Sequence, residues 1–184
     1  PCEDVEKGAY VIPPVEVNPE QTRIVMIAEV PSADPKDYLY GEGSPLQAET
    51  TLTAFRDAGV DLTTMRDLLD FGVYVTTALK CGKIGYGVSA KSILNCSALL
   101  EKELALFPNL EVFLLMGDVA IKAFNYIAKR LEGKRVVPAG STYKIRKNVY
   151  TFRGKRVFPS YLQAGPAFFI EKSKRRMIAE DIRA

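Results

Sequence analysis

Three uninterrupted apolar runs limit how this chain can fold. They cover residues 23–30, 73–79 and 111–116, and turn-forming residues follow each of them. A strand buried on both faces shows a continuous run of this kind, whereas a strand with one solvent face alternates. Helical stretches are expected between the runs, over 44–59, over 89–107 and from residue 118 onward. Strands alternating with helices predict a three-layer α/β/α sandwich whose central sheet has about four mostly parallel strands, the last near 156–158.

Three of the expected helices have recognisable start signals, and the cap of the helix over 89–107 is expected to be Ser89 or Ser92. Ser44 followed by Pro45 is a good N-cap and first helical residue, and Asp118 is in place to cap the helix after the third run. A last helix is expected over 166–183. In a mostly parallel sheet, ligands bind beyond the carboxyl ends of the strands. The residues that follow the runs are therefore the first candidates for a functional site.

The size and composition indicate one domain. The chain has 184 residues, 47% of them hydrophobic, which suffices for one sizeable core. We expect a single domain over 1–184, with the proline-containing residues 1–22 as an extended arm. The absence of any apolar run near the ~20 residues of a membrane span predicts no membrane partner. An acidic start without a secretory signal and an odd number of cysteines predict a cytoplasmic protein, which we expect to be a monomer.

Charge is distributed unevenly along the chain. Residues 1–70 contain 14 acidic and 5 basic side chains, whereas 71–184 contain 20 basic and 8 acidic ones. Ten of the basic residues lie between 129 and 156, with the single acid Glu132. A basic half suits a polyanion such as nucleic acid, although a solvated lysine-rich face would give the same pattern.

Histidine is absent from the chain. This excludes Ser–His and Cys–His nucleophile pairs and every histidine-ligated metal site. A general base has to be a carboxylate, a lysine, a tyrosine or a thiol.

Four short motifs follow the predicted strands in order. They are Ala28-Glu-Val-Pro-Ser32, Lys80-Cys81, Gly117-Asp-Val-Ala120 and Phe158-Pro-Ser-Tyr161. In this order they resemble the uracil-DNA glycosylase superfamily, and most closely its iron–sulfur-containing family four. The resemblance runs from residue 23 to the last helix, and it depends on the order and spacing of the motifs because no single motif is specific.

The resemblance implies a role for each matching residue, with several departures in the base pocket. Glu29 matches the family's catalytic glutamate and Pro31 its proline. Leu46 stands where a phenylalanine stacks on the flipped base, and Thr77 stands where an asparagine reads the uracil edge. Phe158 replaces the histidine that supports the leaving base. The base pocket is therefore expected to be altered.

DNA contacts are implied at the rim of this cleft. Lys80 would point toward a phosphate, and the segment around Ser160 carries the family's wedge into the duplex. The expected DNA-binding residues are Lys80, Ser160, Tyr161, Leu162, Arg153, Lys155 and Arg156.

The cysteines match part of a cluster site. Cys81 and Cys96 occupy positions of two iron–sulfur ligands in the family, and Cys2 is a third candidate. A 4Fe–4S cluster needs four thiolates, so three of its four ligands are present in this sequence. Three unrelated buried thiols are the alternative.

The resemblance implies a DNA glycosylase-like enzyme that hydrolyses the N-glycosidic bond of uracil or another deaminated or damaged base in DNA, single-stranded or with the base flipped from a duplex. Two alternatives stay open. One is a catalytically silent nucleic-acid-binding member of the same superfamily. The other is an α/β domain that binds a nucleotide or metabolite, but its support is weak because no phosphate-binding glycine motif is present.

Overall fold

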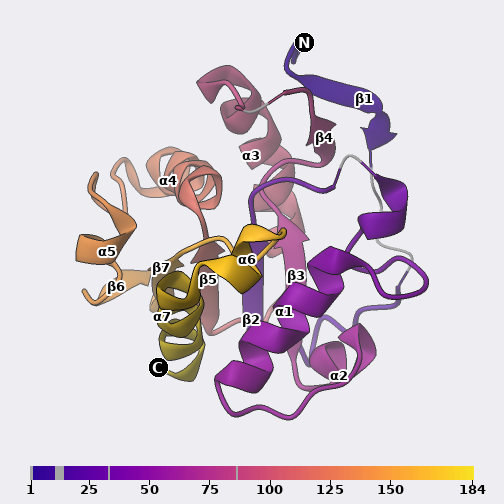
Figure 1. Cartoon of the computed structure of the whole chain (residues 1–184). Coiled ribbons are helices and arrows are strands. Elements are labelled where there is room, and N and C mark those ends of the chain that lie inside the picture. The colour runs from indigo at the N-terminus through magenta and orange to yellow at the C-terminus, as the bar shows by residue number, and fades with distance from the viewer. Residues whose placement is uncertain (1, 11–14, 33, 86) are drawn as a thin grey trace.

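The structure, a computed structural model, describes residues 2–10, 15–32, 34–85 and 87–184. Its centre is a five-stranded sheet of order β3-β2-β5-β7-β6 (Figure 1). All neighbours are parallel except β6 and β7. The strands are β2 (Ile24–Ala28), β3 (Val73–Thr77), β5 (Val112–Met116), β6 (Tyr150–Phe152) and β7 (Lys155–Ser160). The predicted α/β sandwich is confirmed, with one antiparallel edge strand more than expected.

Helices cover both faces of this sheet (Figure 1). On one face α1 (Leu46–Asp57) contacts α7 (Lys172–Arg183), where Arg175 donates to Asp57 at 2.8 Å. On the other face α3 (Ala90–Leu104) contacts α4 (Asp118–Glu132), where Arg130 pairs with Glu101 at 2.7 Å. The shorter helices are η1 (Pro35–Asp37), α2 (Met65–Asp70), α5 (Thr142–Ile145) and α6 (Ala167–Ile170). No helix of the described residues is long and apolar enough to span a bilayer.

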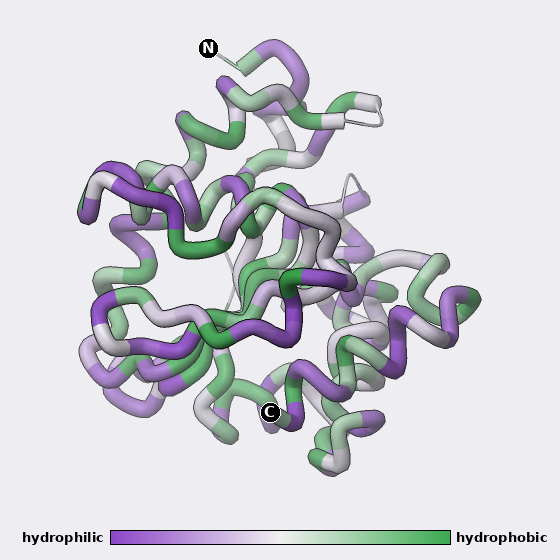
Figure 2. The backbone as a smooth tube through the Cα atoms, turned by 90° about the vertical axis from the view of Figure 1, so that its left-hand side faces the viewer, coloured by the Kyte–Doolittle hydropathy of each residue, from purple (hydrophilic) through white to green (hydrophobic). Residues whose placement is uncertain are grey.

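The apolar runs form the core because their strands are covered on both faces, as predicted. Val25, Met26 and Ile27 of β2 are fully buried, because β2 has neighbours on both sides and helices on both faces. In Figure 2 the strands run through the middle as hydrophobic segments, while hydrophilic residues concentrate in the outer helices and loops. A buried parallel strand needs apolar side chains on both faces, and these runs supply them.

The edge strand β3 is closed by a side chain. The hydroxyl of Tyr40 donates to the Val75 carbonyl and accepts from the Val75 N–H, both at 3.0 Å. These backbone groups would otherwise be free to pair with another chain. Burial raises the pKa of Tyr40, so its hydroxyl stays protonated.

The N-terminal arm is attached to the domain. Within it β1 (Val5–Tyr10) pairs antiparallel with β4 (Cys81–Lys83), a strand that the sequence analysis missed. Val5 belongs to the common hydrophobic core, and the Asp4 carboxylate accepts from the Ser89 N–H and the Ser92 hydroxyl at the start of α3. Residues 1 and 11–14 of the predicted arm lie outside the described residues.

Of the three predicted helix caps, Ser89 is confirmed at α3, where its hydroxyl accepts from the Ser92 N–H at 3.2 Å, and the other two need correction. At α1 the Ser44 side chain makes no cap hydrogen bond, and Asp37 of η1 accepts from the Gln47 N–H at 3.0 Å instead. At α4 the N-cap is Gly117, and the Glu29 carboxylate accepts from the Val119 N–H at 3.1 Å. In both cases a carboxylate from a preceding loop replaces the expected local cap.

Candidate active site

The carboxyl ends of β2, β3, β5 and β7 meet at one edge of the sheet, because these four strands are parallel and in register. The loop after β2 leads to α1 on one face, whereas the loop after β5 enters α4 on the other face. Adjacent strands whose loops leave to opposite faces open a crevice between them. Glu29 and Gly117, the residues directly after β2 and β5, lie at this crevice.

Glu29 is half-buried and is held by backbone groups. Its Oε1 accepts from the Val119 N–H, in the first turn of α4. A carboxylate in this position is held by the backbone at the start of α4.

The surroundings of Glu29 favour its neutral form. Burial raises the pKa of Glu29 above its usual range, and the nearby Asp118 carboxylate adds to the shift. The Val119 and Asp118 N–H groups and the charge of Lys83 act in the opposite direction. Perturbed carboxyl groups at a strand-end crevice are typical of catalytic sites, so Glu29 is the strongest candidate in this chain.

Gly117 makes room for the Glu29 side chain. Its φ is +100°, and a Cβ at this position would lie 2.5 Å from Glu29 Oε1 and 2.9 Å from Cδ. Only glycine satisfies both conditions without displacement. The sequence analysis included Gly117 in a motif but gave it no role, although a glycine between a buried strand and a helix signals such a close approach.

Gly117→Ala is expected to destabilise the protein and displace Glu29. The positive φ alone costs about 1–3 kcal/mol, and contact with the carboxylate adds to it. Urea unfolding measures the cost. Gly59→Ala is the matched control, since Gly59 has φ +94° with nothing within 4 Å of an added Cβ. Equal losses of stability in both variants would show that the positive φ, and not the contact with Glu29, accounts for the cost of Gly117→Ala.

The predicted base-pocket residues come from different elements. Pro31 is buried after β2, and Leu46 is half-buried at the start of α1. Thr77 ends β3, but it is 6% exposed and its hydroxyl donates to the Leu79 carbonyl. This intramolecular bond leaves its donor engaged, so Thr77 is poorly placed to read a base.

Phe158 is not brought to Glu29. It pairs in register with Leu114 inside the sheet, two residues before the end of β7. Its side chain points to the same face as that of Ser160, which contacts α7. The Arg156 guanidinium lies 4.5 Å from its ring centre. Glu29, by contrast, contacts α4 on the other face. The prediction that both line one pocket is therefore wrong.

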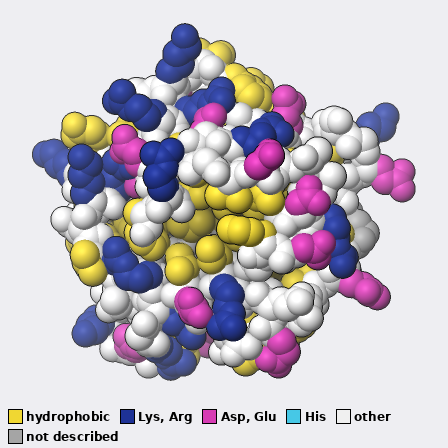
Figure 3. All heavy atoms as spheres, turned by 90° about the horizontal axis from the view of Figure 1, so that it is seen from below, with side chains coloured by type: hydrophobic (Ala, Val, Ile, Leu, Met, Phe, Trp, Pro, Cys, Tyr) yellow, Lys and Arg dark blue, Asp and Glu magenta, His cyan; other side chains and the backbone are white. Residues whose placement is uncertain are grey.

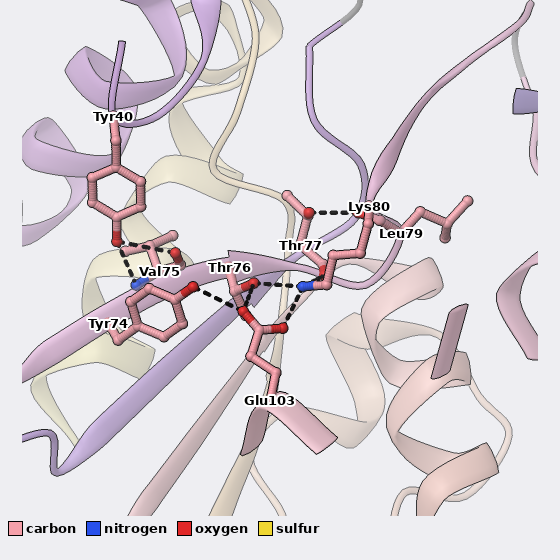
Figure 4. A network of polar contacts seen from close by, with 8 residues as sticks. All are labelled: Tyr40, Tyr74, Val75, Thr76, Thr77, Leu79, Lys80 and Glu103. Carbon is pink, nitrogen blue, oxygen red and sulfur yellow. Dashed lines mark hydrogen bonds and ion pairs between the residues drawn. The ribbon is translucent and has the colours of Figure 1, made fainter. Parts of the chain in front are cut away.

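Lys80 requires the clearest correction. It was predicted to face DNA phosphate, but it is 9% exposed and its ammonium points into the protein (Figure 4). Its Nζ donates to the Thr76 hydroxyl at 2.7 Å and to the Thr77 carbonyl at 2.8 Å, and it pairs with the Glu103 carboxylate. Glu103 also accepts from the Tyr74 and Thr76 hydroxyls, each at 2.8 Å. Lys80 thus joins the end of β3 to α3.

Ser160 is also buried rather than at the rim. It has no exposed surface, and its hydroxyl donates to Asp181 of α7. Arg146 donates to the same carboxylate at 3.1 Å, which ties α7 to β7 and α5. Burial raises the pKa of Asp181, and the bonds from Arg146 and Ser160 oppose that shift. Tyr161 and Leu162, half-buried and exposed respectively, do follow β7 at the candidate edge.

Two predicted DNA-binding residues lie at the wrong end of the sheet. Lys155 begins β7, and its ammonium donates to the Leu110 carbonyl just before β5. Arg153, in the turn before β7, pairs with Glu132 at the end of α4 at 3.7 Å. Lys155 and Ser160 are five positions apart along the strand, roughly 16 Å. Figure 3 views this opposite end, where hydrophobic side chains are exposed among lysines and arginines.

Arg156 also faces away from the candidate edge, since its guanidinium donates to the Tyr150 carbonyl at 3.1 Å. The basic residues 153–156 therefore belong to the far end of the molecule, contrary to the prediction that they rim the cleft.

The three cysteines share one region but do not complete a cluster site. Cys81 lies on β4 and Cys96 on α3, and burial together with the nearby Cys96 and Cys2 thiols raises the pKa of Cys81. All three are free thiols. Within the described part of the chain, no group of three cysteine, aspartate or glutamate side chains is placed to hold a metal ion. The given sequence supplies three of the four thiolates of a cubane, so the cluster stays a prediction and no chemistry is assigned to it here.

Comparisons with known proteins leave the family open. No protein-family model matches the chain, and no curated protein matches it. A crystal structure of wild-type UNG from Nitratifractor salsuginis is similar over 90% of this chain and 74% of that chain, with 14% identity and a TM-score of 0.43. Similarity at this level assigns neither an activity nor a site residue.

Proposed function

We propose that this protein is a DNA glycosylase-like hydrolase that removes uracil or another deaminated or damaged base from DNA. The observation that carries the proposal is the Glu29 carboxyl, which is half-buried, has a raised pKa and lies at the crevice between β2 and β5. The motifs that resemble the glycosylases supply the substrate class, and three of them end strands at the same edge as Glu29.

The proposed chemistry needs a carboxylate near the sugar. As the glycosidic bond breaks, positive charge grows on the sugar and negative charge on the departing base. The flipped base leaves the stack at a cost of a few kcal/mol. An ionised Glu29 would orient the attacking water or offset the sugar's charge, while Tyr161 and Leu162 support the gap in the duplex. The engaged Thr77 hydroxyl and the lack of a hydrogen-bond donor in the Phe158 side chain argue against strong selection for uracil.

An excision panel tests the proposal. Oligonucleotides with one uracil, hypoxanthine or xanthine, in single and double strands, are incubated with the protein and cleaved at abasic sites by alkali. Cleavage of at least one substrate supports a glycosylase. DNA binding without cleavage would favour the silent, binding-only protein, and the absence of both would reject the proposal.

The excision rate is expected to decrease as the pH is lowered. The decrease should begin at a higher pH than it would for a glutamate with an ordinary pKa. Burial raises the pKa of Glu29, and only its ionised form can serve the sugar, so the rate rises with pH through that raised value. Single-turnover rates between about pH 4 and 8 measure the acid side of the pH–rate profile, and circular dichroism checks that the protein stays folded. A rate independent of pH throughout this range would remove Glu29 from the rate-limiting step.

A further inference from the structure

A cavity of about 390 Å³ lies beside the candidate site, between α4 and the segment that follows it. One wall is the α4 face that carries Asp118, Lys122, Tyr126 and Lys129, and the facing wall comes from residues 135–145. We call this cavity the α4 pocket. Its volume lies within the range of small-molecule sites. Asp118 lines the pocket and also acts on the Glu29 charge, so the two sites adjoin.

Three cations of the α4 pocket have no anionic partner. Lys122, Lys129 and Arg135 all line it, and none forms an ion pair or side-chain hydrogen bond with any described residue. Arg130, one residue after Lys129, shows the opposite behaviour, since it bonds both Glu101 and Ser97. All three are exposed, and with the Asp118 carboxylate the pocket lining still has two more cations than anions. A bound anion would balance that excess of positive charge.

The floor of the same pocket is apolar. Ile93, Ile121 and Ile145 line it, each less than 9% exposed, and the half-buried Tyr126 stands beside them. An inorganic anion makes no use of such a floor. A ligand with a flat apolar part and an anionic group uses both halves of the site.

The facing wall is held in place before any ligand binds. The Asn125 side chain accepts from the Val136 and Val137 N–H groups at 3.0 and 3.1 Å, and it donates to the Val137 carbonyl at 2.9 Å. These three bonds fix the segment that carries Arg135 against α4. A preorganised wall lowers the ordering cost of binding.

We propose that the α4 pocket binds a nucleotide 5′-monophosphate, with the base on the isoleucine floor and the phosphate between Lys122, Lys129 and Arg135. The ligand is either a free nucleotide or the phosphorylated end of a DNA strand, which present the same chemistry. The proposal does not depend on base excision, because none of the three cations contacts Glu29.

Titration calorimetry with thymidine 5′-monophosphate tests the site, with thymidine as the ligand without phosphate. The wild type should bind the monophosphate at least about tenfold more tightly than thymidine. Lys122→Gln/Lys129→Gln should weaken binding about tenfold. Lys36→Gln/Lys102→Gln, which removes two exposed lysines outside the pocket, should leave it within about twofold. Competition by a 5′-phosphorylated oligonucleotide, but not by its 5′-hydroxyl form, would identify a strand end as the source, and its failure a free nucleotide.

No binding of the monophosphate to the wild type, or equal losses in the two lysine pairs, would overturn the proposal. Binding that persists in Glu29→Gln separates this site from the excision site. Loss of excision therefore leaves the test of the pocket intact.

Discussion

Glu29→Gln is expected to slow base excision by roughly 10²–10⁴-fold, the usual contribution of a positioned acid–base group. Glutamine keeps the size of the side chain and an oxygen that can accept from the Val119 N–H, so the start of α4 remains capped. It removes the negative charge that the sugar cation requires. The loss should appear in the single-turnover rate, with DNA affinity nearly unchanged.

A measurement of stability distinguishes the loss of excision in Glu29→Gln from misfolding. The raised pKa of Glu29 means that the folded state holds its proton more tightly than the unfolded chain. Stability contributed by this group is therefore lost as pH rises through the raised pKa. At neutral pH the glutamine variant should be at least as stable as the wild type in urea. Unchanged excision in a folded Glu29→Gln protein would exclude Glu29 as the catalytic carboxylate.

The sequence was sufficient to predict the sheet because its signal is local. Continuous apolar runs at 23–30, 73–79 and 111–116 became the neighbouring strands β2, β3 and β5. The position of Glu29 could be predicted from these strands, because any residue that ends a central parallel strand lies at the carboxyl edge of the sheet. The short strands β1 and β4 escaped prediction, because their pairing joins segments more than 70 residues apart.

Polar partners distant in sequence could not be predicted. Lys80 follows β3 and Ser160 ends β7, as expected, but Glu103 and Asp181 turn both side chains inward. Nothing around Lys80 in the sequence distinguishes a lysine that meets a phosphate from one that meets a buried carboxylate. The error on Lys155 was avoidable, because a residue at the start of a parallel strand lies at the opposite edge from residues at its end.

Lys80→Met is expected to destabilise the protein by about 3–5 kcal/mol, the cost of breaking a buried ion pair. The side chains of Lys80 and Glu103 are only 11% and 19% exposed, so solvent screens the pair weakly. Without the ammonium, Glu103 keeps the Tyr74 and Thr76 hydroxyls as donors, but its buried charge is no longer neutralised. Urea unfolding measures the loss, and Lys102→Met, an exposed lysine on the same helix as Glu103, should cost less than about 0.5 kcal/mol.

A double variant that also changes Glu103 tests what Lys80 does. Lys80→Met/Glu103→Gln removes both charges and keeps an oxygen that accepts from the Tyr74 and Thr76 hydroxyls. It should recover most of the stability, because no buried charge is left unpaired. A lysine that serves DNA would behave differently. Its replacement would cost little stability, weaken DNA binding and reduce the salt dependence of that binding by about one counterion. That result would restore the phosphate contact implied by the resemblance, whereas recovery in the double variant would establish Lys80 as the link between β3 and α3.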